Sequence, residues 1–439
     1  MKENIEKFFK LKHKKTDIRT EILAGITTFL TMSYIIIVNP QILSAGNSVP
    51  YPGALTATII VSALSSILMG LYSNTPFALA PGMGINAFFT FTVVMGMGID
   101  WKVALGTVFI SGIIFIILTL LKIRTSIVRA IPKCVVDGVA AGIGIFLAFI
   151  GLTESGFIQS NPVTYLSMGD FSAKMVLFII GFIFTTILVS KKVKGALLFG
   201  IIFTTIISFM SGRVFGNDIL ITIPETLTSK PDFSSAFLKL DIMGALKFSM
   251  IGVILTFLFT DLFDSISTYL GVAHAANMLD ENGEPENIDE SLLVDAVSTI
   301  MSGLMGTSAG TVFVESASGI EEGGRSGLTA VVTGILFLPF LYFAPAIAMI
   351  PLFAAAPALV IVGFFMTKPL AEVDFTKMEQ SLPAFLGMIL IPLTYSITQG
   401  ISWSIIIYTI LNVFNGKMKE IPLMLYILTV ISVIVLFLV

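Results

Sequence analysis

The chain has 439 residues, of which 55% are hydrophobic and 12% charged, and its mean hydropathy is +0.96. Soluble domains carry about 25% charged residues, so this composition excludes an ordinary soluble protein and predicts a polytopic membrane protein. The net charge of −3 gives no reason to expect a nucleic-acid partner, and the single cysteine, Cys134, excludes an internal disulfide.

The sequence gives no support for enzymatic or ATP-driven chemistry. His13 and His274 are the only histidines, so no metal-ligand cluster is visible and no cofactor is expected. A P-loop lysine motif is missing as well, and no nucleophile–base pair stands out. We therefore expect neither an enzyme nor an ATP-driven pump.

Residues 1–20 are charged and lack the apolar core of a signal peptide. Their basic run, Lys10 to Arg19, is typical of the cytoplasmic side of a membrane protein. We expect a cytoplasmic N-terminal tail at residues 1–20 of a multi-pass protein of the plasma membrane.

Seven segments are expected within residues 21–211, the first of two repeats. They lie at about residues 21–43, 54–71, 77–89, 103–121, 135–152, 174–190 and 196–210. The third is short and interrupted by Pro81, Gly82 and Gly84. Two basic loops, Lys122–Lys133 and Lys191–Lys194, both face the cytoplasm only if this broken segment crosses the membrane.

A polar connection at residues 212–242 precedes the second repeat, residues 243–439. Apolar spans are expected at about residues 243–277, 292–305, 328–343, 354–366 and 423–438. Residues 382–414 are too long for one helix and are expected to divide near Gly400. This gives one span more than a perfect seven-plus-seven arrangement.

The stretch from Gly306 to Ala330 is the second broken segment, with four charged residues among glycines. Thr311–Val314 is β-branched and aromatic and predicts extended chain, and a short helix should begin at Glu315. Because odd-numbered repeats enter the membrane from opposite sides, Thr311–Val314 should meet Phe77–Ala80 near the bilayer centre. Non-helical backbone at that depth needs protein partners or a water-filled cavity, which favours a transport site here.

Four phrases of the sequence resemble the AzgA-like purine permeases, a branch of the nucleobase–ascorbate transporter superfamily. They are Glu21–Tyr34, Ala80–Phe89, Asp261–Thr268 and Glu315–Thr329. The likeness covers nearly the whole chain. It implies the all-α uracil-permease fold: two inverted seven-segment repeats, about 14 transmembrane segments, core and gate domains, and strands with half-helices in the third and tenth segments. It also implies proton-coupled uptake of hypoxanthine, guanine or adenine.

By this resemblance, Asp264 is the acid of the eighth segment, Glu315 opens the half-helix of the tenth, and Asn86 is the polar residue of the third. The uracil and xanthine branches have Asn directly after the tenth-segment acid or amide. Ser316 stands there in this chain, which disfavours uracil and xanthine as substrates.

The residues themselves support a site at the two acids. A charge at the bilayer centre costs at least about 2.5–3.5 kcal/mol, so Asp264 marks a functional site, unless it merely pairs with Lys247 or a backbone donor. Asp261 lies on the same helix face but outside the family match, so a structural role is favoured. Thr268 either lines the same cavity or bonds to its own helix.

Each remaining candidate has a functional and a structural interpretation. Glu315 either offers its carboxylate to a ligand or caps its own helix, and Asn86 either binds substrate or is a satisfied amide. Phe88 can stack on a planar base or pack between helices. Three charged residues near the cytoplasmic end more plausibly form an ion-pair lock than contact substrate: Glu321, Glu322 and Arg325.

These expectations combine into one functional hypothesis: import of hypoxanthine or guanine with a proton, by alternating access of a core against a gate domain. The expected substrate-binding residues are Asp264, Glu315, Asn86, Ser316, Thr268, Gly84 and Phe88. Asp264 and Glu315 are expected to supply proton coupling. The alternatives are an adenine-preferring permease and an anion transporter or channel on the same fold. The expected partners are a purine base, a proton and the lipid bilayer, with a homodimer left open.

Overall fold

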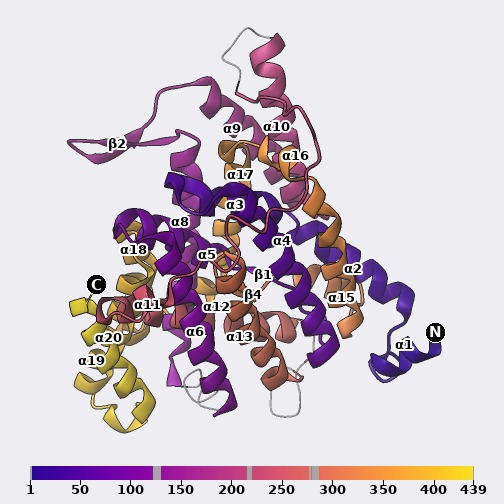
Figure 1. Ribbon diagram of the computed structural model, residues 1–439. Helices are drawn as coiled ribbons and strands as arrows, with labels where there is room; N and C mark the ends of the chain where they lie inside the picture. The colour runs from indigo at the N-terminus through magenta and orange to yellow at the C-terminus, as the bar shows by residue number, and fades with distance from the viewer. Residues whose placement is uncertain (1, 122–129, 215–219, 276–277, 279–285, 439) are drawn as a thin grey trace.

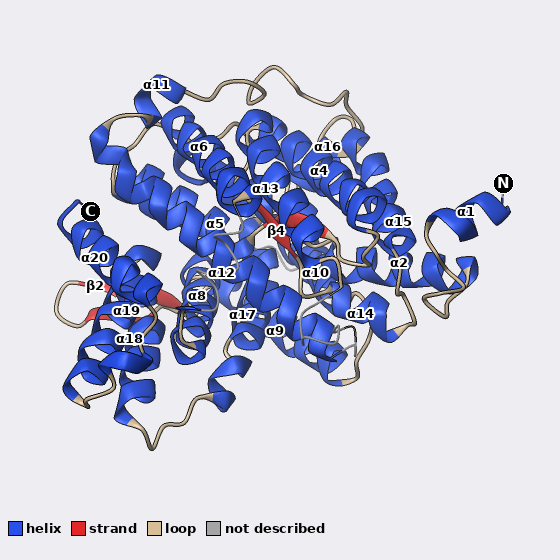
Figure 2. Cartoon of the chain, turned by 90° about the horizontal axis from the view of Figure 1, so that it is seen from below, coloured by secondary structure: helices blue, strands red, loops and turns tan. Residues whose placement is uncertain are grey.

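The computed structural model describes residues 2–121, 130–214, 220–275, 278 and 286–438. Among these residues, seven helices are long and apolar enough to span a membrane, and shorter apolar helices accompany them. The chain is therefore a multi-pass membrane protein, and Figures 1 and 2 show that helices make up most of it.

The first half of the chain folds in the expected order, with its third segment broken. Its elements are α1 (Lys2–Phe8), α2 (Ile18–Met32), α3 (Ile35–Ser44), α4 (Tyr51–Leu68), β1 (Leu79–Pro81), α5 (Met83–Ala87), α6 (Trp101–Leu120), α8 (Lys133–Glu154), β2 (Ile158–Asn161), β3 (Tyr165–Met168), α9 (Ala173–Ser190) and α10 (Ala196–Val214). The first span, expected as one helix, is divided between α2 and α3 by a turn at Ser33 and Tyr34. A π-helix, Phe88–Gly96, continues α5.

In the described residues, the second half likewise consists of helices with one short strand among them. Its elements are α11 (Ile242–Ala245), α12 (Ile251–Ala275), α13 (Ile288–Met305), β4 (Gly310–Val312), α14 (Ser316–Glu321), α15 (Gly327–Phe337), α16 (Ala344–Ala348), α17 (Leu352–Met366), α18 (Met378–Thr394), α19 (Ile397–Phe414) and α20 (Leu423–Leu438). The expected division of residues 382–414 is confirmed. It falls at Tyr395, whose φ of 53° is left-handed, and not at Gly400.

The two broken segments pair with each other, as predicted. Strands β1 and β4 are antiparallel, with Ala80 opposite Thr311, and both views place them inside the bundle (Figures 1 and 2). The short helices α5 and α14 follow the strands directly. The prediction of paired extended pieces that lead into half-helices is confirmed, although β1 begins two residues later than expected.

Neighbouring groups complete the hydrogen bonding of this short strand pair. The Phe313 N–H donates to the Ala78 carbonyl at 3.0 Å, and the Gly82 N–H donates to the Ala309 carbonyl at 2.9 Å. The Ser66 hydroxyl accepts from the Leu79 N–H and donates to the Leu79 carbonyl, both at 3.0 Å. These partners make extended backbone tolerable away from water.

Helix packing divides the bundle into two groups. We call α2–α6 and α12–α15, with β1 and β4, the core group; its helices pack chiefly on one another, for example α6 on α13 and α15 on α2 and α4. We call α8–α10 and α17–α20 the gate group, in which α17 and α18 pack on α8 and α20 packs on α19. The strand pair thus belongs to the core group.

The N-terminal segment, expected as a tail, is docked on the core group. Phe9 and Leu11 are buried against Leu328 of α15. Asp17 caps α2: hydrogen bonds from the backbone N–H and the hydroxyl of Thr20, at 3.0 and 3.1 Å, hold the pKa of this carboxyl below its ordinary value.

Candidate functional site

Two carboxylates from distant parts of the sequence lie near each other, beside the strand pair. Asp264 lies midway along α12 and accepts a hydrogen bond from the hydroxyl of Thr311 in β4. Glu315 occupies the residue before α14, and its carboxylate is close enough to Asp264 for the two charges to interact. Both side chains are partly accessible. The structure therefore brings together the two acids that the sequence singled out.

The Glu315 side chain does not cap its own helix, so the capping interpretation is wrong. Its Oε1 instead accepts a hydrogen bond from the hydroxyl of Tyr34, at 2.8 Å. Tyr34 lies at the turn between α2 and α3 and is only 1% exposed. Each of the two acids thus accepts a hydrogen bond from one hydroxyl group: Asp264 from Thr311, and Glu315 from Tyr34.

Asn86 belongs to a buried amide network whose orientation follows from its partners. Thr58 uses its hydroxyl hydrogen on the Ala54 carbonyl at 2.6 Å, so its oxygen must accept from Asn39 Nδ2, which lies 2.7 Å away. Asn39 Nδ2 also lies 2.9 Å from the Thr307 hydroxyl. Asn39 Oδ1 therefore faces Asn86 and accepts from its Nδ2 at 2.8 Å. Among the described residues, Asn86 Oδ1 has no hydrogen-bond partner.

Of the other four candidates, Ser316, Phe88 and Gly84 make packing or backbone contacts in this structure. Ser316 Oγ accepts from the Ala78 N–H at 3.0 Å, and Phe88 packs edge-on against Phe257 at 5.0 Å between ring centroids. A Cβ on Gly84 would lie 2.4 Å from a side-chain atom of Ile143, so this glycine permits the close approach of α5 to α8. Thr268 is partly exposed on α12. Their contact with substrate stays a prediction.

A second pair of buried acids lies between α12 and α13. Asp261 accepts from the Thr299 hydroxyl at 2.6 Å, and Asp295 accepts from the Ser265 hydroxyl at 2.9 Å. Both side chains are buried, and Asp295 is near enough to Asp264 for an electrostatic interaction. Asp295 is not in the predicted site, although an acid within the apolar stretch 292–305 is itself a signal.

The charged residues after α14 contact different parts of the chain. Glu322 forms an ion pair with Lys194, in the loop between α9 and α10, and so joins the core group to the gate group. Arg325 does not pair with Glu321 or Glu322: its guanidinium donates to the backbone carbonyls of Ile320 and Gly324. The predicted lock is therefore present in Glu322 alone, with a partner that the sequence did not indicate.

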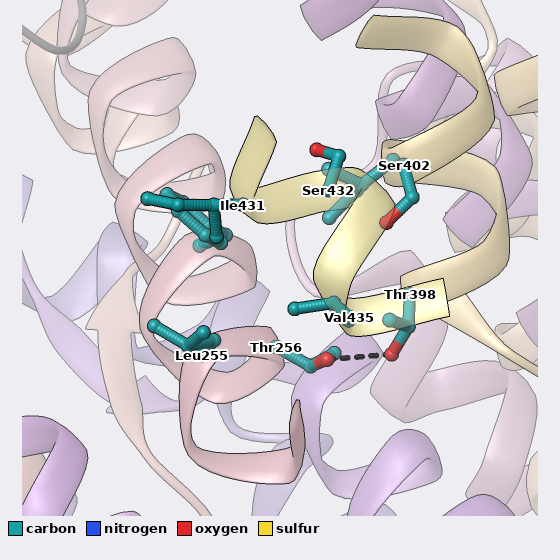
Figure 3. A pocket seen from close by; sticks show the side chains of 9 residues that line it. Leu255, Thr256, Thr398, Ser402, Ile431, Ser432 and Val435 are labelled. Carbon is teal, nitrogen blue, oxygen red and sulfur yellow. Dashed lines mark hydrogen bonds between the residues drawn. The ribbon is translucent and has the colours of Figure 1, made fainter. Parts of the chain in front are cut away.

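A small pocket lies between α12, α19 and α20 (Figure 3), and neither of the two acids lines it. It is lined by Leu255, Thr256, Phe259, Thr398, Ile401, Ser402, Ile431, Ser432 and Val435. The hydroxyls of Thr256 and Thr398 are 2.5 Å apart across it. Thr256 precedes Asp264 by eight helical residues, about 12 Å along α12. Because α12 belongs to the core group, and α19 and α20 to the gate group, the pocket lies where the two groups contact each other.

The chain is similar to known permeases over almost its full length. A family model described as "Permease family" matches residues 19–403. The guanine/hypoxanthine permease PbuG of Bacillus subtilis is 41% identical over 434 residues, which cover 95% of this chain and 96% of PbuG. The adenine permease AdeQ of Escherichia coli is 39% identical over 420 residues, which cover 95% of this chain and 93% of AdeQ.

A solved structure shares the fold at low sequence identity. The transmembrane domain of the cyanobacterial bicarbonate transporter BicA matches with a TM-score of 0.65 and 18% identity, over 88% of this chain and 97% of that domain. At this identity the likeness concerns the fold alone.

Proposed function

Because this chain belongs to the AzgA-like branch of the nucleobase–ascorbate transporter superfamily, a family of permeases and not of enzymes, we propose that it imports hypoxanthine and guanine together with protons. The observation that carries the proposal is the meeting of Asp264 and Glu315 beside the β1–β4 pair. The two acids come from separate segments and are partly accessible beside the broken segments. They offer a polar cargo hydrogen-bond acceptors inside a membrane protein.

The chemistry of an oxopurine suits these groups. Hypoxanthine and guanine present an N1–H donor next to the O6 acceptor. The carboxylate of Glu315 or Asp264 accepts the N–H, and charge-assisted hydrogen bonds of this type are the strong ones. Asn86 Oδ1, which has no partner among the described residues, can accept from a second ring N–H.

Proton coupling rests on the same two acids. Two neighbouring carboxylates disfavour simultaneous ionisation, so a proton that binds to one of them relieves their repulsion. A neutral base that moves with one proton carries a net positive charge, and an inside-negative membrane potential then drives uptake. We also propose that the protein lies in the plasma membrane with its N-terminus in the cytoplasm.

Alternating access would move the core group, which holds both acids, against the gate group. Among the described residues, three polar contacts join the groups at separate places and would have to break: Glu322 with Lys194, Thr256 with Thr398, and the Thr92 hydroxyl with the Tyr395 carbonyl.

Adenine is the second candidate cargo, because AdeQ is almost as similar to this chain as PbuG. Adenine has an amino group at position 6 where the oxopurines have O6, so the two cargo classes need different partners there. An anion as cargo is disfavoured, because two carboxylates in one site repel it.

Reconstituted protein can test the proposal. Proteoliposomes with an imposed inward proton gradient should accumulate radiolabelled hypoxanthine, and unlabelled guanine should compete better than adenine or uracil. Accumulation that follows a sodium gradient and ignores a protonophore would contradict proton coupling. Competition by adenine alone would assign the chain to the adenine permeases.

A further inference from the structure

We propose that Tyr34 is a positioning residue of the substrate site, whose hydroxyl holds one oxygen of Glu315 and leaves the other for the base. This inference rests on the proposed function and concerns a residue to which no specific role is assigned from sequence patterns. The observation behind it is the hydrogen bond of 2.8 Å from the phenol to Glu315 Oε1.

The surroundings of Tyr34 fix its hydroxyl in place. Its ring is 1% exposed, and its carbonyl accepts from the Ile37 and Val38 N–H groups, both at 3.0 Å, at the start of α3. A buried aromatic side chain with two χ angles has little freedom, whereas a partly accessible glutamate has three rotatable bonds. Tyr34 is therefore the fixed partner and Glu315 the one that is held.

Close packing of α14 on α2 brings the two residues together. A Cβ on Gly319 would lie 2.1 Å from the Thr28 hydroxyl and 2.6 Å from the Ala24 carbonyl, so only glycine allows this approach. The same contact carries the start of α14, with Glu315, towards the end of α2. The Tyr34–Glu315 bond thus depends on how the core group packs and not on the gate group.

A phenol hydroxyl has a single hydrogen, so it donates to one carboxylate oxygen and leaves the other oxygen for a second donor. Charged groups that face this pair come from Asp264 on α12 and, one step further, Asp295 on α13. Both are acidic, so they push a free Glu315 carboxylate away from them. Tyr34 opposes that displacement and keeps Glu315 next to Asp264, where one base can contact both acids.

A double-mutant cycle tests this role with hypoxanthine as the probe. The four proteins are the wild type, Tyr34→Phe, Glu315→Gln and the double variant, each purified in detergent, with the Kd measured by displacement of radiolabelled hypoxanthine. Tyr34→Phe should weaken binding about tenfold, the loss expected for a hydrogen bond to a charged group. In the Glu315→Gln background the same change should alter Kd only about threefold, because the phenol then donates to a neutral amide oxygen, a hydrogen bond about half as strong.

Tyr51→Phe is the matched control. Its hydroxyl is buried and has no hydrogen-bond partner among the described residues, so its removal should leave Kd unchanged. An equal loss from Tyr34→Phe in both backgrounds, or wild-type binding by Tyr34→Phe, would overturn the positioning role. If Glu315→Gln binds too weakly to measure, Glu315→Asp takes its place, since its shorter side chain withdraws from the phenol. Wild-type protein that binds no purine would instead overturn the proposed function.

Discussion

The Glu21 carboxylate takes two hydrogen bonds from Thr329, one from its hydroxyl at 2.6 Å and one from its backbone N–H at 3.2 Å. The same carboxylate accepts from the N–H groups of Arg325 and Ser326, at 2.9 and 3.1 Å. A fully buried acid on α2 thus adds to the cap that Ser326 provides at the start of α15, where free N–H groups favour an anion.

Glu21→Gln should therefore destabilise the protein by about 1.5–3 kcal/mol. The amide is uncharged, and its NH₂ group would face the N–H and hydroxyl donors that the carboxylate accepts from. A thermal unfolding midpoint several degrees lower in detergent is the expected readout. Glu290→Gln is the control, since Glu290 is exposed at the start of α13. Equal midpoints for Glu21→Gln and wild type would show that the cap contributes little.

Asp264→Asn should weaken hypoxanthine binding about tenfold to a hundredfold, because it removes a charged acceptor at the site while keeping the side-chain shape. Equilibrium binding to purified protein measures this loss. Asp289→Asn, an exposed acid on α13, controls for the charge change. Binding like that of the wild type would remove Asp264 from the site.

Asn39→Ala should lower hypoxanthine affinity about tenfold without touching the substrate itself, because Asn86 would lose the partner that orients its amide. Transport kinetics should show the change in KM. Asn412→Ala is matched to it: that amide is also buried but bonds to the Tyr408 carbonyl of its own helix. A similar loss in both variants would mean that general packing, and not the orientation of Asn86, is responsible.

Breaking the Glu322–Lys194 pair by reversing the charge of Glu322 should change transport rate more than affinity, because the pair joins the core and gate groups away from the acids. Its side chains are 35% and 50% exposed, so its strength is about 0–1 kcal/mol and falls with salt. We expect Glu322→Lys to alter the maximal uptake rate up to a few-fold, and the swapped variant Glu322→Lys with Lys194→Glu to restore it. No rescue by the swap would argue against a direct pair.

The two broken segments could be predicted because their composition conflicts with a spanning helix. Pro81 with Gly82 and Gly84 after it, and Thr311–Val314 before Glu315, each signal a break by local chemistry. The division of the first span at Tyr34 could not be predicted in the same way. Ser33 and Tyr34 keep right-handed helical φ and ψ values, so the turn there leaves no proline or glycine signal in the sequence.

The two acids of the candidate site could be predicted from the sequence, because each is recognisable as a single residue. Asp264 and Glu315 are charges in apolar segments, and such residues signal themselves. Tyr34 and Asn39 form hydrogen bonds with residues that lie far away in the sequence, Glu315 and Thr307. A tyrosine in an apolar stretch looks like ordinary packing until its partner is known, so only the folded chain identifies these two.

The pairing of β1 with β4 also has a consequence for biosynthesis. Translation delivers β1 to the membrane long before β4 exists, and during that interval its backbone N–H and C=O groups lack their strand partner. Each unpaired group of this kind costs several kcal/mol in lipid. The N-terminal half is therefore expected to reach its final structure only after β4 has been synthesised. Maturation of this protein is therefore expected to finish late, and a ribosome that stalls before Gly310 should release a fragment that membrane proteases remove.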